Sequence, residues 1–238
     1  MKFTKLISMK TIGLIGGMSW ESSLEYYRII NQEVKRKLGN LHSAKSLMFS
    51  VNFDEIQHLQ HIGDWDKLNS IMVDAAIRLE KGGANFIVIC TNTMHRMASI
   101  IEANVSIPIL HIADTTAQRI KEQGINTIGL LGTKFTMEQD FYKGRLTELH
   151  SIKVITPPQD DRNTVHSIIY NELCQGQILQ PSKEKYIRII ENLKTEGAEG
   201  VILGCTEIPL LVKQQDVTIP IFDTTRIHAE MAVEYALK

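Results

Sequence analysis

The stretch "GANFIVICTNTMH", residues 83–95, is an apolar run that ends at a cysteine and continues into small and polar residues. A second stretch, "GAEGVILGCTEI" at 197–208, follows the same plan. Short continuous apolar runs bounded by glycine and turn residues are typical of strands that are buried on both faces. The two stretches therefore predict two buried strands, each of which ends at polar residues.

Both stretches belong to a longer internal repeat. The sequence "TIGLIGG" at 11–17 resembles "TIGLLGT" at 127–133, and "IPILHIADTT" at 107–116 resembles "IPIFDTT" at 219–225. The motifs keep the same order in both halves of the chain. A repeat of this length predicts two lobes that are built on one plan.

Helical patterns lie between the short β-branched runs of each half. Apolar residues recur every three or four positions over 20–38, at Leu24, Tyr27, Ile30, Val34 and Leu38. The same spacing over 65–79 predicts a second amphipathic helix. Strand runs are expected at 11–15, 46–51, 85–90, 107–110, 127–131, 152–156, 200–204 and 219–222.

Apolar strands that alternate with helices indicate an α/β fold with parallel sheets covered on both faces. We expect two pseudo-symmetric lobes, each a mostly parallel sheet flanked by helices, with the active site between them. The first lobe is predicted at 1–113 plus 223–238 and the second at 114–222. The last helix is expected to pack back on the first lobe.

Composition excludes several classes of function. The chain has 238 residues, 43% of them hydrophobic, and a net charge of −1, which gives no electrostatic reason to expect nucleic acid as a partner. No apolar run approaches the roughly 20 residues of a membrane span. The start "MKFTKLISMKTIGLIGG" indicates a strand and a glycine turn rather than a signal segment, so a cytoplasmic location is expected. The three cysteines have no CxxC spacing, and the absence of HExxH leaves a metal site without support.

The motifs "IGLIGGMSWES", "CTNTMH" and "GCTEIPLL", in this order, resemble the aspartate/glutamate racemase family and its broad amino-acid racemase branch. The resemblance covers the chain from Met9 onward. It implies an enzyme that uses no cofactor and forms a homodimer, and whose two lobes enclose an amino acid. One acid/base group from each lobe then works on opposite faces of the substrate Cα.

The register of the first motif decides which side chains are implied. Most of the family reads Cys-Asn-Thr there, so the resemblance places Thr91 at the position of the first cysteine and Cys90 one residue earlier. The internal repeat gives the same register, because Gly83 precedes Thr91 by the same spacing as Gly197 precedes Cys205. Side chains alternate along a strand, so Cys90 is expected to point away from Thr91 and into the core.

Cys205 is thus the predicted catalytic base and Thr91 the predicted group on the opposite face. A cysteine pKa near 8.5 falls at a helix N-terminus, so a thiolate is expected at the start of the following helix. A threonine hydroxyl is far less acidic, although it can relay or donate a proton. The resemblance assigns the second-lobe cysteine to the L face, which favours L-amino acids as substrates. The implied substrate-binding residues are Met18, Gln60, Asn92, Thr93, Thr206 and Glu207.

Other interpretations stay open at this point. A one-cysteine decarboxylase or isomerase of the same superfamily fits a single cysteine in the cleft, and a non-catalytic amino-acid binder fits the two-lobe plan. His95 either orients a neighbour or is a helix-surface residue bonded to a backbone carbonyl. Cys174 follows a helical apolar pattern and is expected to serve packing. The segments "VNFDEIQ" at 51–57 and "YNELCQG" at 170–176 carry no Arg or Lys, which argues against strict aspartate specificity.

Overall fold

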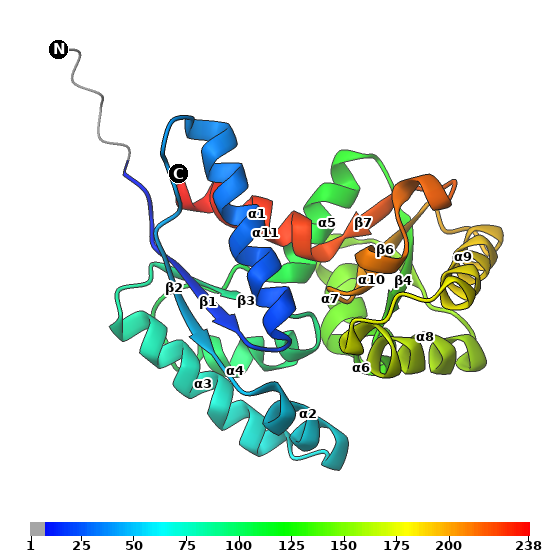
Figure 1. Ribbon diagram of the computed structural model, residues 1–238, viewed down its shortest axis with the longest axis horizontal. Coiled ribbons are helices and arrows are strands. Elements are labelled where there is room, and N and C mark those ends of the chain that lie inside the picture. Colours follow the sequence, from blue (N-terminus) through cyan, green and yellow to red (C-terminus); the bar gives the residue numbers. More distant parts are fainter. Residues whose placement is uncertain (1–7) are drawn as a thin grey trace. The chain divides into compact units, whose positions relative to one another are not determined.

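The computed structural model describes residues 8–238; the first seven residues, with Lys2 and Lys5 of the predicted non-signal start, lie outside the described part. Two compact units make up the chain (Figure 1). Unit 1 contains the described residues up to Cys90, together with Met97–Leu110 and Ala229–Lys238. Unit 2 contains Thr91–Arg96 and His111–His228. The lobe boundaries inferred from the repeat stay a prediction.

The sheet of unit 1 has the order β2-β1-β3, and its strands are parallel. Its strands are β1 (Ile12–Gly16), β2 (Ser46–Ser50) and β3 (Phe86–Ile89). The strand expected at 107–110 is reduced to an isolated parallel bridge between Ile109 and Ile87. Pro108 lies in this segment and has no N–H to offer a ladder, which limits the pairing to a short edge.

The helices assigned to unit 1 are α1 (Trp20–Leu38), α2 (Phe53–Ile62), α3 (Trp65–Lys81) and α4 (Ala98–Glu102). The predicted helices over 20–38 and 65–79 are confirmed as α1 and α3. The predicted apolar face of α1 is partly wrong, because Leu24 and Tyr27 are 56% and 50% exposed, whereas Tyr26 and Ile29 are buried. Adjacent tyrosines at 26 and 27 fit either of two neighbouring stripes, and packing selects the stripe that continues into Ile29.

The core of unit 1 encloses Cys90. This side chain is fully buried and packs in one cluster with Leu14, Tyr26 and Val88. Burial raises the pKa of its thiol, and the Sγ atom faces the Val88 carbonyl at 3.9 Å. The same cluster includes Ala229, Ala232, Val233 and Ala236 from the end of α11 (Thr224–Ala236). The prediction that Cys90 belongs to the core is therefore confirmed.

The glycine turn after β1 is required by the backbone. Gly17 has a φ of 91°, and a Cβ placed there would lie 2.2 Å from the Val51 carbonyl oxygen. Only glycine can adopt this conformation against a neighbouring backbone without strain. The turn leads to Ser19, whose hydroxyl accepts a hydrogen bond from the Ser22 N–H at 3.3 Å and caps α1.

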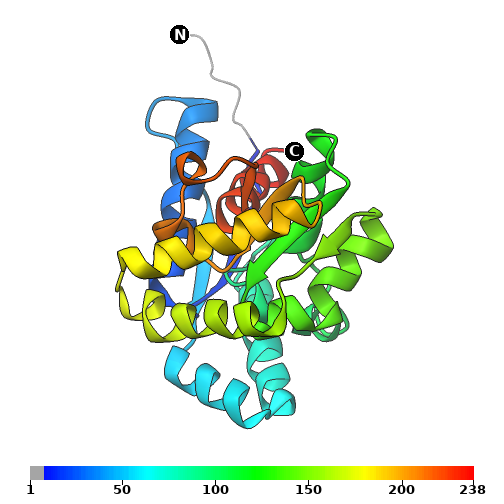
Figure 2. The ribbon, with the colours of Figure 1, turned by 90° about the vertical axis from the view of Figure 1, so that its right-hand side faces the viewer.

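The sheet of unit 2 has the order β5-β4-β6-β7 and is also parallel. Its strands are β4 (Thr127–Gly132), β5 (Lys153–Ile155), β6 (Gly200–Gly204) and β7 (Ile221–Asp223). Its helices include α5 (Ile112–Glu122), α6 (Lys134–Glu138), α7 (Asp140–His150), α8 (Gln159–Asn171), α9 (Gln180–Thr195) and α10 (Ile208–Leu211). Helices α8 and α9 lie side by side (Figure 2) and are joined by the ion pair of Arg188 with Asp161.

The predicted α/β class with two parallel sheets flanked by helices is confirmed. In unit 2, the central strand β6 is buried along its whole length, as its continuous apolar sequence predicts. Over residues 8–238, no helix has the length and apolar character needed to span a bilayer.

Candidate active site

Three adjacent strands of unit 2 end at one edge of the sheet. Strand β6 lies between β4 and β7, with Gly132 opposite Gly204 and Leu203 opposite Asp223. The residues that follow these strands are Thr133, Cys205 and Thr224. Their side chains therefore emerge along the carboxyl edge of a parallel sheet, where α/β proteins bind their ligands.

The segment 91–93 is hydrogen-bonded to this edge on both sides of β6. Asn92 Nδ2 lies 3.0 Å from Thr224 Oγ1, at the end of β7. Thr93 Oγ1 lies 3.1 Å from Thr133 Oγ1, at the end of β4. Because β6 lies between these two strands, the segment is held beside the strand end that carries Cys205. The structure thus brings the two predicted motifs, "CTNTMH" and "GCTEI", to the same edge of unit 2.

Asn92 has one polar atom to spare, and that atom is an oxygen. The Thr224 hydroxyl donates its only hydrogen to the Leu203 carbonyl at 3.0 Å, so it must accept from the amide group of Asn92. This fixes the orientation of the amide. Asn92 is 2% exposed, and its Oδ1 has no hydrogen-bond partner among the described residues. The side chain therefore has an acceptor oxygen without a partner, and an ammonium group is a suitable donor to it.

Cys205 lies in a polar environment that keeps its proton in place. The side chain is half-buried, and its Sγ donates to Glu207 Oε2 at 3.0 Å. The Thr206 hydroxyl donates to the same oxygen at 2.6 Å. Burial first, and then the charge of Glu207, raises the pKa of the Cys205 thiol well above its ordinary value.

The expected lowering of the Cys205 pKa at a helix N-terminus is therefore wrong, because the surroundings of the thiol raise that pKa instead. Helix α10 follows Cys205 but spans only Ile208–Leu211, too short to present a substantial helix dipole. The group nearest the sulfur is a carboxylate that stabilises the neutral thiol.

Tyr170 and Cys174 are two neighbours of Cys205 that the sequence did not assign to the site. The pKa of Tyr170 is raised by burial and then by the charges of Cys205, Cys174 and Glu207. Cys174 also contributes to raising the pKa of the Cys205 thiol. It lies in a short 3-10 helix (Leu173–Gln175) directly after α8. No sequence signal marks these two residues, since Tyr170 lies within α8 and Cys174 continues the apolar pattern of that helix.

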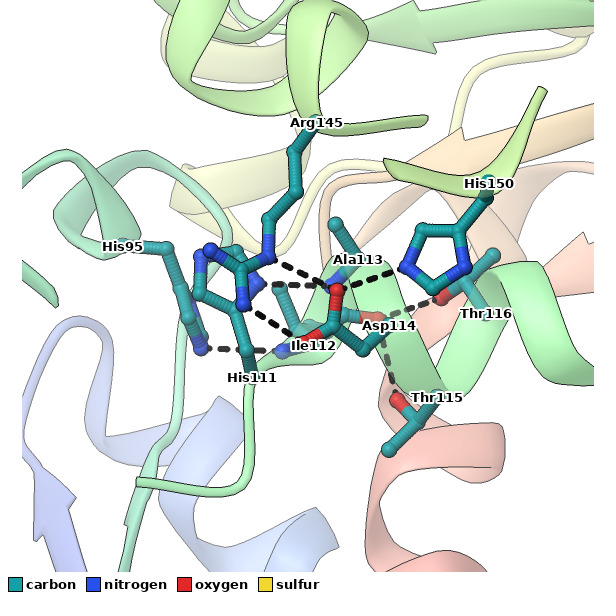
Figure 3. A network of polar contacts seen from close by, with 9 residues as sticks. All are labelled: His95, His111, Ile112, Ala113, Asp114, Thr115, Thr116, Arg145 and His150. Atoms are coloured by element: carbon teal, nitrogen blue, oxygen red, sulfur yellow. Dashed lines mark hydrogen bonds and ion pairs between the residues drawn. The ribbon is translucent and has the colours of Figure 1, made fainter. Parts of the chain in front are cut away.

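His95 and its neighbours form a second polar network in unit 2 (Figure 3). The His95 ring lies 4.6 Å from the ring of His111 and 5.6 Å from that of His228, measured between centroids. Arg145 binds the carboxylate of Asp114 through two hydrogen bonds of 2.7 Å. His95 is buried, so of the two interpretations left open the helix-surface one is wrong, although the bond to a backbone carbonyl is present.

Met18 and Gln60 lie in unit 1, and each is 5% exposed. Their predicted contact with substrate stays a prediction. Within residues 8–238, no three His, Cys, Asp or Glu side chains are grouped so that they could hold a metal ion.

The model of the Asp/Glu/Hydantoin racemase family matches residues 15–232. The chain belongs to this family. Across 97% of the chain and all of the compared chain, it is 57% identical to a crystal structure described as a candidate Asp/Glu racemase from Yersinia pestis, with a TM-score of 0.91. It is 36% identical to an aspartate racemase homologue from Pyrococcus horikoshii OT3, with a TM-score of 0.83 and the same coverage.

The broad specificity amino-acid racemase RacX of Bacillus subtilis is 25% identical over 170 residues, which are 71% of this chain and 73% of that protein. Racemases of this kind are isomerases that act on amino acids. The racemase resemblance predicted from the three motifs is confirmed. Both Thr91 and Cys205 lie within the range matched by the racemase family model.

Proposed function

We propose that the protein is a cofactor-independent amino-acid racemase of the aspartate/glutamate type. Cys205 removes and returns the α-proton on one face of the substrate, and the hydroxyl of Thr91 serves the opposite face. The observation that supports this assignment is the pair of bonds from Asn92 to Thr224 and from Thr93 to Thr133, which hold the Thr91 segment beside the strand end of Cys205.

In this proposal, the substrate itself supplies the positive charge that favours ionisation of Cys205. An α-amino acid carries an ammonium group, and the carboxylate of Glu207 is the nearest anion to the sulfur. When the ammonium pairs with Glu207, the carboxylate no longer stabilises the protonated thiol, and the pKa of Cys205 falls toward the range in which a thiolate forms. The free oxygen of Asn92 is a second acceptor for the same ammonium group.

The two faces of the substrate are served unequally in this proposal. A thiol has an ordinary pKa near 8.5, whereas an aliphatic hydroxyl is far less acidic, so Cys205 removes a proton much more readily than Thr91 does. Thr91 returns a proton to the carbanion from its own side. With Cys205 on the L face, as the family resemblance implies, L-amino acids lose their α-proton faster than D-amino acids.

The experiment is α-proton exchange in D₂O, followed by NMR, with L- and D-aspartate and L- and D-glutamate. The protein is dialysed against EDTA, and no pyridoxal phosphate is added. We expect exchange of the L-enantiomers at least roughly tenfold faster than of the D-enantiomers. Equal rates for both enantiomers would refute the unequal faces, and a requirement for added metal or pyridoxal phosphate would refute the cofactor-independent reaction.

Two further properties are proposed from the family alone. We expect a homodimer, which light scattering in solution tests, and a cytoplasmic location, which fractionation of cells tests. A monomer at working concentration would contradict the first of these, and recovery outside the cytoplasmic fraction the second.

A further inference from the structure

We propose that His95 is the positioning residue that fixes Thr91 for proton transfer, an inference that rests on the proposed function. His95 lies in a short 3-10 helix (Thr93–Met97) and is 2% exposed. Its Nδ1 lies 2.7 Å from the Thr91 carbonyl oxygen. Its Nε2 lies 3.2 Å from the backbone nitrogen of Ile112, the first residue of α5. The ring therefore connects Thr91 to the start of a helix.

The two partners of the ring allow only one tautomer. A carbonyl oxygen can only accept, so Nδ1 must carry the hydrogen that is shared with Thr91. The backbone N–H of Ile112 can only donate, so Nε2 must be unprotonated. His95 works as a neutral bridge with a donor at one end and an acceptor at the other.

The far end of this bridge is a fixed point. The Ile112 carbonyl accepts from the hydroxyls of Thr115 and Thr116 at 2.9 and 2.7 Å (Figure 3). His111 Nδ1 accepts from the Ala113 N–H at 3.2 Å and caps the same helix. In the same first turn of α5, Asp114 is bound by Arg145 of α7 at 2.7 Å. Ile112 thus sits in a helix start whose position several bonds determine.

Asp114 has a further partner, because His150 Nε2 lies 2.8 Å from its Oδ1. This adds the end of α7 to the support of α5. A hydrogen bond from His95 to Thr91 consequently ties the candidate proton donor to two packed helices. The side chain of Thr91 is β-branched and has few rotamers, so the direction of its hydroxyl follows its backbone.

The surroundings of His95 prevent it from serving as the acid itself. Burial, followed by the nearby His111 and His228, lowers the pKa of His95 well below its ordinary value. Arg145 acts in the same direction. A ring that stays neutral and uses both nitrogens in bonds can orient Thr91 but has no proton to give to a substrate.

Two substitutions separate the two ends of the bridge. His95→Asn places an amide N–H at the position of Nδ1, so it keeps the bond to Thr91 and loses the bond to Ile112. His95→Gln places an amide oxygen near the position of Nε2, so it keeps the bond to Ile112 and loses the bond to Thr91. If His95 serves only to cap α5, His95→Asn should lose more of the inversion rate. If His95 positions Thr91, His95→Gln should lose more of it.

The readout is the fate of L-aspartate in D₂O, followed by NMR and chiral chromatography. Exchange without inversion needs only Cys205, whereas inversion needs Thr91. We expect His95→Gln to lower inversion roughly tenfold while exchange without inversion persists, and His95→Asn to stay within about twofold of wild type. In the Thr91→Ala background, His95→Gln should add no further loss. An equal loss of both processes, or a larger loss in His95→Asn, would overturn the proposal.

Hydrogen–deuterium exchange of the backbone at 91–96 tests the anchoring without any activity. We expect roughly tenfold faster amide exchange of this segment in His95→Gln, and little change in His95→Asn. Unchanged protection in His95→Gln would overturn the anchoring of Thr91 even in an active racemase. Wild-type protein that exchanges none of the four amino acids would instead refute the proposed function, whatever the backbone protection shows.

Discussion

Replacing Cys205 by serine is expected to lower the α-proton exchange of L-amino acids by about 10³-fold, the range that a positioned general base contributes. Serine retains the size of the side chain and the hydrogen bond to Glu207 Oε2, which the thiol makes at 3.0 Å. It loses the acidity, because a serine hydroxyl does not ionise near neutral pH even when an ammonium group pairs with Glu207. The measurement is the initial rate of deuterium incorporation into L-aspartate and L-glutamate.

The matched control is Cys90→Ala, one residue before Thr91. Cys90 is fully buried among apolar side chains of unit 1, so its removal leaves a small cavity and costs roughly 1–2 kcal/mol of folding free energy. Exchange should continue at the wild-type rate at a temperature where the variant is folded. Loss of exchange in Cys90→Ala, together with retention of exchange in Cys205→Ser, would show that Cys90 and not Cys205 is the catalytic base.

Acid is expected to destabilise the protein strongly between about pH 6.5 and 4.5. Burial first, and then the charge of Arg145, lowers the pKa of His111 from 6.5 to about 3. Over this window His111 binds a proton in the unfolded chain but stays neutral in the folded protein. Its contribution to the free energy of unfolding is therefore fully present above pH 6.5 and falls as the pH decreases. Each such histidine costs about 1.4 kcal/mol per pH unit, or about 3 kcal/mol for His111 across the window.

His95, whose pKa is lowered in the same direction, adds to the loss. The effect is large beside a typical total stability of roughly 5–15 kcal/mol. The measurement is the urea midpoint at a series of pH values. Besides burial, the charges of Arg145, His228 and His150 lower the pKa of His111, and the ring of His95 lies 4.6 Å from its ring.

The control is His111→Asn, since asparagine is also a good N-cap and its oxygen can accept from the Ala113 N–H in place of Nδ1. This variant should remain folded at neutral pH and lose about half of the pH dependence in the window if His95 supplies the rest. A pH dependence identical to that of wild type would show that His111 is not the group that resists protonation.

The sequence predicts most of the fold because the pattern that specifies it is local. Apolar runs such as 85–90 and 200–204 mark buried strands, and the strand–helix alternation indicates parallel sheets. The buried face of α1 differs in part from the prediction because Tyr26 and Tyr27 are the same residue type, and only packing decides which of them is buried. The edge strand at 107–110 was overestimated because Pro108 limits its ladder.

The candidate site was only partly readable for a physical reason. The spacing of the repeat separates Cys90 from Thr91, and the burial of Cys90 agrees with that register. The state of Cys205 was misjudged, since the pKa of its thiol depends on where the Glu207 carboxylate turns and on how soon α10 ends. Neither quantity has a local sequence signal.

The hydrogen bonds that hold the Thr91 segment join residues that are far apart in the sequence. Thr224, Thr133 and Ile112 come from three separate elements, and each contributes one bond to the segment 91–95. Threonine and isoleucine are common residues at such positions, so the sequence gives no reason to single them out. Only the arrangement of β4, β6 and β7 in one sheet places Thr133 and Thr224 beside the motif.

The most direct measurement compares the initial α-exchange rates of L- and D-aspartate, in wild type and in Thr91→Cys. A cysteine at position 91 supplies a second thiol, with an ordinary pKa near 8.5, on the face where the hydroxyl stands. We expect an L-to-D ratio of at least roughly ten in wild type and a ratio near one in Thr91→Cys. An unchanged ratio in Thr91→Cys would contradict the assignment of Thr91 to the face opposite Cys205.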